Sequence, residues 1–126
     1  MASRGAVAKN GHVTEDEYQT VKKVYDAKVL LGKHGEHSLP DYSHTPNRIY
    51  IKENSDGSFR EMRVYNEKRR LYLEIGYHGE YHLTGNRKQP ILHYHKYDEN
   101  LDRTSADYLP KEMYEKYKKY LEAYGL

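Results

Sequence analysis

The chain has 126 residues, which suits one domain that buries its own core. It contains no cysteine, so thiolate catalysis, cysteine zinc sites and a disulfide framework are excluded. The net charge of +2 and the sequence pI of about 8.6 are too mild to indicate a nucleic-acid-binding protein by themselves. No apolar run is long enough for a membrane helix or for the core of a signal peptide, so we expect no membrane insertion.

The amino-terminal part of the sequence predicts a leader followed by a helix. We expect residues 1–13 to form a flexible leader and residues 14–126 to form a single globular domain. The segment Thr14-Glu15-Asp16-Glu17 fits a capping box, in which a hydroxyl and a carboxylate bond to amides that a helix start leaves unpaired. Apolar residues then recur at helical spacing up to Gly32, which can end the helix: Tyr18, Val21, Val24, Tyr25 and Leu31.

Beyond an irregular stretch, we expect four β-strands: residues 48–53 and 71–78, which alternate, residues 59–65, which return from a turn, and residues 91–97, which follow a loop. Consecutive strands joined by short turns pair antiparallel. Pro110 fits the first turn of a final helix, along which tyrosines recur at helical spacing. The predicted fold class is α+β, with an N-terminal helix, a four-stranded antiparallel meander and a C-terminal helix.

Four of the eight histidines fall in one short window: His78, His82, His93 and His95. An imidazole exchanges a proton near neutral pH and can also bind a metal. On a strand, His93 and His95 share one face and are separated by roughly 6.5 to 7 Å, a spacing that can place one ring on each side of a phosphate. One histidine would then remove the 2′-hydroxyl proton of RNA and the other would protonate the leaving 5′-oxygen. His82 or His78 would position the phosphate or take one of those roles.

Basic and aromatic residues near this window are candidates for substrate binding. Arg87, Lys88 and Arg63 can supply the positive charge that stabilises a phosphorane. The ring of Tyr97 can stack on a base. These residues extend the histidine pattern into a predicted site for RNA cleavage.

Two other interpretations of the histidines remain open. A strand His-x-His pair with a third histidine is also typical of metal centres, with His82, His93 and His95 as ligands and Glu80 as a possible carboxylate. Alternatively, histidine, tyrosine and lysine pack well on an exposed sheet face and keep a polar end in water without any catalysis. A non-catalytic phage or nucleic-acid-binding module would fit this last interpretation.

The run from Glu74 through His78 and His82 to Pro90-Ile91-Leu92-His93-Tyr94-His95 resembles the carboxy-terminal toxin domains of bacterial polymorphic and contact-dependent toxins. In those domains a strand ending near a histidine leads through a polar loop to a Pro-His-x-His segment. Related segments occur at the ends of phage head-associated proteins. The resemblance covers residues 74–98. Here Ile91 and Leu92 separate the proline from the first histidine of the pair, which is a departure from the pattern.

Many such domains are metal-independent ribonucleases of the barnase, colicin and RelE type of fold, in which the exposed face of a four-stranded sheet carries the site. The resemblance therefore implies a ribonuclease toxin that needs no cofactor and has RNA as its substrate. It also implies an immunity protein as partner, and a secreted or delivered bacterial effector that acts in the cytoplasm of the target cell. Without delivery, the expected location is cytoplasmic.

Overall fold

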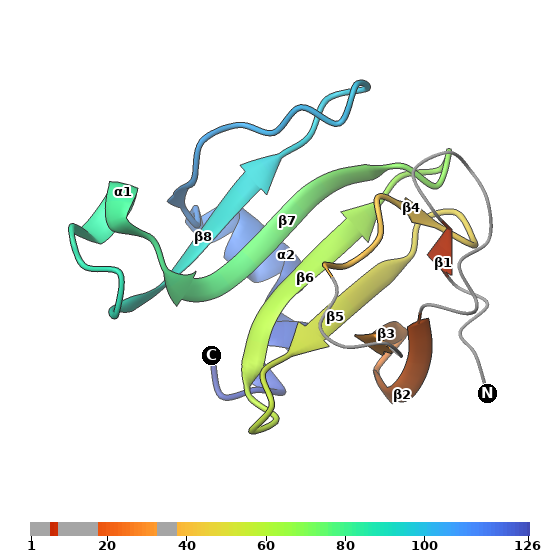
Figure 1. Cartoon of the computed structure of the whole chain (residues 1–126), viewed down its shortest axis with the longest axis horizontal. Helices are drawn as coiled ribbons and strands as arrows, with labels where there is room; N and C mark the ends of the chain where they lie inside the picture. The colour runs from red at the N-terminus through yellow and green to blue at the C-terminus, as the bar shows by residue number, and fades with distance from the viewer. Residues whose placement is uncertain (1–5, 8–17, 33–37) are drawn as a thin grey trace.

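The computed structural model describes residues 6–7, 18–32 and 38–126. Within these ranges the chain is an α+β fold dominated by one mixed sheet, whose strand order is β2-β3-β5-β6-β7-β8-β9 (Figure 1). The strands of this sheet are β2 (Tyr18–Val24), β3 (Ala27–Gly32), β5 (Ile49–Glu53), β6 (Phe59–Tyr65), β7 (Leu71–Gly79), β8 (Pro90–Lys96) and β9 (Asp107–Tyr108). The remaining elements are the β1 (Ala6–Val7) and β4 (Tyr42–Ser43) pair and the helices α1 (Tyr81–Thr84) and α2 (Lys111–Glu122).

The predicted N-terminal helix is wrong, because its described part forms the β2–β3 hairpin. Val24 pairs with Ala27 across a two-residue turn, in which Tyr25 has a positive φ of 55°. Residues of β2 and β3 include several β-branched side chains, which favour strands over helices. The side chains of Val21 and Leu31, expected on the buried helix face, are 45% and 54% exposed. The proposed capping box and most of the predicted leader lie outside the described residues.

The predicted four-stranded meander is also wrong as a description of the sheet. The four predicted segments do form β5 to β8, and each of these strands pairs antiparallel with the next. The sheet extends beyond them on both sides, because β3 pairs with β5 in parallel and β9 pairs with β8. The parallel β3–β5 pair makes the sheet mixed instead of antiparallel.

The helix α2 covers one face of this sheet, as predicted for the C-terminal segment (Figure 1). Its buried residues Tyr117, Tyr120 and Leu121 form one core with side chains of the central strands. Those strand residues include Ile51, Met62, Val64, Leu73 and Ile75. Among the described helices, none is long and apolar enough to cross a membrane.

A second core lies on the opposite face, at the β2–β3 side of the sheet. Its buried residues are Tyr18, Leu30, Leu39, Tyr50, Tyr65 and Leu71. The rings of Tyr50 and Tyr65 meet edge to face with centroids 5.0 Å apart. The Tyr65 hydroxyl donates a hydrogen bond to the Pro40 carbonyl, which gives this buried polar group a partner. The rest of that face, over β7 and β8, is polar.

Candidate functional site

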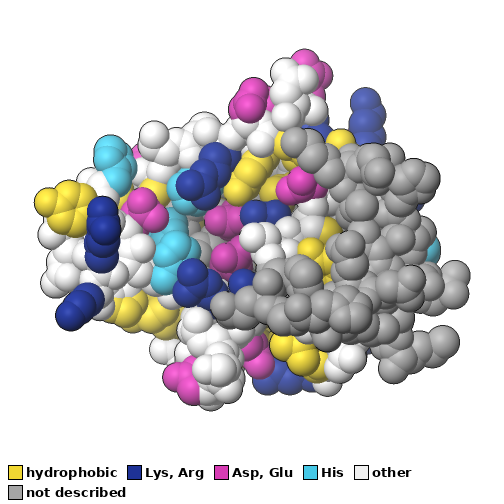
Figure 2. Space-filling model, viewed as in Figure 1, with side chains coloured by type: hydrophobic (Ala, Val, Ile, Leu, Met, Phe, Trp, Pro, Cys, Tyr) yellow, Lys and Arg dark blue, Asp and Glu magenta, His cyan; other side chains and the backbone are white. Residues whose placement is uncertain are grey.

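The face of the sheet opposite α2 carries a row of three histidine rings on β7 and β8. This histidine row consists of His78, His93 and His95. In the register of these strands Gly76 lies opposite His93 and Glu74 lies opposite His95. The His93 ring is nearly perpendicular to both neighbours, with centroids 4.6 Å from His78 and 5.6 Å from His95. Figure 2 shows histidine side chains gathered beside acidic side chains on this face, with lysine and arginine side chains nearby.

Gly76 provides the space in which two of these rings meet. A Cβ at position 76 would lie 2.9 Å from His93 Nε2 and 3.0 Å from His78 Nε2, closer than carbon and nitrogen atoms normally approach. Both Nε2 atoms are therefore directed at the space beside the glycine. A glycine inside a strand often marks such a close approach, and this signal was present in the sequence.

The other ring nitrogen of each histidine is held by a main-chain carbonyl. The Nδ1 atoms of His93, His95 and His78 lie 2.7, 2.8 and 3.2 Å from the carbonyl oxygens of Ile91, Thr104 and Gly79. A carbonyl oxygen only accepts hydrogen bonds, so Nδ1 carries the proton and donates it. In its neutral form such a ring has its lone pair on Nε2, where it can take up a proton or bind a metal.

His93 is the most buried member of the row. Its side chain is 0% exposed, and burial lowers the pKa of His93, although the hydrogen bond to Ile91 acts in the opposite direction. The ring is therefore mainly neutral at pH 7. Among the described residues His93 Nε2 has no hydrogen-bond partner, and the Glu80 Oε2 atom lies 3.8 Å away. An unsatisfied buried acceptor typically costs about 1 to 3 kcal/mol of stability, so the lone pair of His93 Nε2 destabilises the fold unless something binds it.

A hollow of about 350 Å³ opens beside the row. It combines a carboxylate, two imidazoles and a guanidinium in one small space. The described residues that line it are Glu80, His82, His95, Arg103, Thr104, Ser105 and Ala106. These groups come from the end of β7, from α1, from β8 and from the connection between β8 and β9. His93 is not among the described residues of this lining, so His95 is the strand histidine that a bound molecule in the hollow can reach.

Arg63 and Tyr97, predicted to bind substrate, belong to an ion network beside the row. Arg63 Nε lies 2.8 Å from Glu74 Oε1 and 3.6 Å from Glu61 Oε2, and Arg63 Nη1 donates to the Leu39 carbonyl at 2.6 Å. Burial by itself lowers the pKa of Arg63, but Glu74, Tyr65, Tyr97 and Glu61 together outweigh it, so the pKa is raised. The Tyr97 hydroxyl donates to Glu74 Oε1 at 3.2 Å, and its ring lies under the Arg63 guanidinium. The positive charge of Arg63 is thus balanced by carboxylates of the protein itself.

The two other predicted basic residues lie in the loop after α1. Arg87 and Lys88 are exposed, the Arg87 guanidinium is placed over the Tyr81 ring, and neither is among the described residues lining the hollow. The loop folds back over the end of β7 and contacts Gly79 closely. A Cβ at position 79 would lie 1.7 Å from the Arg87 carbonyl oxygen, so only glycine fits there. Arg103 provides the guanidinium at the hollow instead. No sequence pattern identified it, since it lies in a loop.

Possible metal ligands are also brought together, in a set that differs from the predicted one. One ligand atom each from His78, Glu80 and His93 lies within 4.8 Å of the other two, and this is the set of three found among the described residues. The predicted set was His82, His93 and His95. His82 is exposed on α1 and lines the hollow instead.

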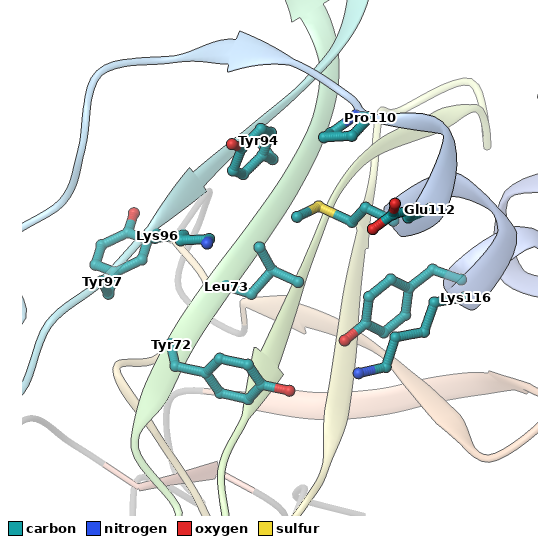
Figure 3. A pocket seen from close by; sticks show the side chains of 10 residues that line it. Tyr72, Leu73, Tyr94, Lys96, Tyr97, Pro110, Glu112 and Lys116 are labelled. Carbon is teal, nitrogen blue, oxygen red and sulfur yellow. The ribbon is translucent and has the colours of Figure 1, made fainter.

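A larger cavity of about 580 Å³ lies on the α2 side of the sheet (Figure 3). Its described lining is mostly tyrosine and apolar side chains with two lysines and one glutamate, and no histidine is among them. Tyr94 and Lys96, which line this cavity, lie on the opposite face of β8 from His93 and His95. The concentration of proton-exchanging groups favours the smaller hollow as the reactive site.

Comparisons of the chain with protein-family models, with curated proteins and with solved structures gave no match.

Proposed function

We propose that the protein cleaves RNA in the hollow by metal-independent acid–base catalysis. The observation that carries this proposal is the convergence of Glu80, His95 and Arg103 on one hollow of about 350 Å³. A carboxylate, an imidazole and a guanidinium are the base, the acid and the positive charge that RNA transesterification requires.

In the proposed reaction Glu80 removes the proton from a ribose 2′-hydroxyl. The 2′-oxygen attacks the adjacent phosphorus, the bond from phosphorus to the 5′-oxygen breaks, and a protonated His95 gives its proton to that oxygen. The products are a 2′,3′-cyclic phosphate and a 5′-hydroxyl. Arg103 stabilises the negative charge that builds up on the phosphorane. Thr104 supports the role of His95, because its carbonyl holds Nδ1 and leaves Nε2 to exchange the proton.

Of the other predicted residues, His93 lies next to Glu80 and outside the described lining, so in this proposal it does not touch RNA. His82 lines the hollow and contacts the phosphate. Arg87 and Lys88 are exposed on the adjoining loop and bind the RNA backbone, a contact that weakens with salt.

The proposal extends to a role as a toxin, which the resemblance noted in the sequence supports. The segment that resembles bacterial toxin domains, residues 74–98, includes most of β7, all of α1 and β8, and supplies Glu80, His82 and His95 to the hollow. In this proposal the protein is delivered into a target cell, cuts RNA in its cytoplasm and is neutralised by an immunity protein that covers the hollow.

The test is cleavage of a defined RNA by purified protein in excess chelator. Glu80→Gln, His95→Gln and Arg103→Ala should each lower the rate by about 10²- to 10⁴-fold, and should suppress growth inhibition when expressed in bacteria. Glu112→Gln is the matched control, because Glu112 is an exposed carboxylate on α2 at the other face. Unfolding curves show which variants remain folded. Arg103 is exposed, so its replacement should leave the fold intact. Full activity in folded Glu80→Gln and Arg103→Ala would refute the assignment.

A further inference from the structure

The group formed by His78, Glu80 and His93 is not explained by RNA cleavage alone. Its three facing atoms are the two Nε2 atoms and a carboxylate oxygen, all of which donate electron pairs. Among the described residues no hydrogen-bond donor is directed at His93 Nε2. Three converging acceptors repel one another unless a proton or a metal cation lies between them.

We propose that His78, Glu80 and His93 bind one divalent transition-metal ion of the Zn²⁺ class, and that the bound ion suppresses RNA cleavage by holding the Glu80 carboxylate. The first half is independent of the proposed function. The second half rests on it, because Glu80 is there the general base.

The donor set fits this class of metal. Zinc accepts imidazole nitrogen and carboxylate oxygen at about 2.0 to 2.2 Å, which places two ligands of a tetrahedral site about 3.3 to 3.5 Å apart. His93 Nε2 and Glu80 Oε2 are 3.8 Å apart and all three ligand atoms lie within 4.8 Å, so small side-chain rotations complete the geometry. Glu80 is 26% exposed and lies at the end of a strand, where its side chain has room to rotate.

The surroundings of the ligands also match a metal site. An imidazole that binds a metal usually donates a hydrogen bond from its second ring N–H to a carbonyl or carboxylate. This hydrogen bond fixes the orientation of the ring and its tautomer. Here the carbonyls of Ile91 and Gly79 hold Nδ1 of His93 and His78. Gly76 keeps the space between the two Nε2 atoms open, since its missing Cβ would stand 2.9 and 3.0 Å from them.

Suppression of RNA cleavage follows from the position of Glu80, which belongs both to the proposed metal ligands and to the lining of the hollow. Its carboxylate lies beside His93 Nε2 and also lines the hollow with His95 and Arg103. A carboxylate bound to a divalent cation is a weaker base, because the cation draws electron density from both of its oxygens. Metal binding therefore opposes base catalysis at this residue.

The binding half is tested by titrating chelator-treated protein with ZnCl₂ in a calorimeter, and with CoCl₂ while the visible absorption of tetrahedral cobalt is recorded. The parent protein should bind one equivalent of metal. His78→Gln should weaken binding at least 10-fold, and Gly76→Ala should do the same because its Cβ occupies the space between the two nitrogens. His82→Gln is the matched control and should bind as the parent does. Absence of binding by the parent, or loss of binding in His82→Gln with retention in His78→Gln, would overturn the proposed site.

The suppression half is tested by comparing each protein with itself, with and without Zn²⁺. Zinc should inhibit RNA cleavage by the parent and by His82→Gln, and at least 10-fold more zinc should be needed for His78→Gln. Stimulation of cleavage by zinc would overturn suppression and make the ion a catalytic partner. If the parent binds zinc at these residues but cuts no RNA under any condition, the proposed function fails while the metal site stands.

Discussion

Replacing Gly76 by alanine tests whether the histidine rings meet as closely as described. The added Cβ would lie 2.9, 3.0 and 3.1 Å from His93 Nε2, His78 Nε2 and His93 Cε1, so the rings would have to shift by about 0.5 Å to reach ordinary contact. The His93 ring cannot move freely, because it is fully buried and its Nδ1 is tied to the Ile91 carbonyl at 2.7 Å.

The size of the effect follows from two opposing contributions. Overpacking a well-filled site typically costs about 1 to 3 kcal/mol. Replacing glycine by alanine restricts the unfolded chain, which raises the free energy of unfolding by about 0.4 to 1 kcal/mol. We therefore expect Gly76→Ala to lower the free energy of unfolding by about 0.5 to 2 kcal/mol, measured by urea denaturation.

A double-mutant cycle identifies the cause of this loss. His78→Ala removes one of the two crowded rings, and this ring is only half-buried. If crowding is the cause, Gly76→Ala should be less destabilising by at least about 0.5 kcal/mol in the His78→Ala background than in the parent. A stable Gly76→Ala variant, or a loss unchanged by His78→Ala, would contradict the described packing.

Three further variants test the core and the ion network. Leu73→Ala should lower the free energy of unfolding by about 2 to 5 kcal/mol because the side chain is buried under α2, and a loss below about 1 kcal/mol would place it outside the core. Arg63→Ala should cost about 3 to 5 kcal/mol because Glu74 would remain as a buried unpaired charge, whereas unchanged stability with weakened RNA binding would return Arg63 to the substrate site. Burial and the neighbouring Glu74 raise the pKa of Glu61, so protonation favours the folded state and stability falls as pH rises through the raised pKa. Glu61→Gln should gain stability relative to the parent between pH 4 and pH 8 in urea unfolding, and a relative loss over that range would contradict this sign.

The central strands and the final helix were predictable because their patterns are long. Much of β5 and β7 alternates with the period of a strand, and the tyrosines of α2 recur with helical period. The β2–β3 hairpin was not predictable in this way. Its two-residue turn changes the phase of the alternation, so apolar residues on two short strands matched the spacing of a single helix. The two-residue strand β9 is too short to show any period.

The histidine site was only partly predictable for a related reason. Alternation along β8 is enough to infer that His93 and His95 share a face, but it says nothing about depth, and only His95 reaches the hollow. Glu80 and Arg103 arrive from a strand end and a loop, whose positions depend on tertiary packing. Arg63 carries the charge expected of a phosphate ligand, yet Glu74 neutralises it across β6 and β7.

The proposed reaction requires the 2′-hydroxyl as nucleophile and proceeds in the absence of metal. The decisive measurement compares two oligonucleotides of identical sequence in excess chelator, one of RNA and one with 2′-deoxyribose at every position. The parent protein should cut only the RNA and leave 2′,3′-cyclic phosphate and 5′-hydroxyl ends. Cleavage of the 2′-deoxy oligonucleotide, or failure of the folded protein to cut RNA, would contradict the proposed reaction.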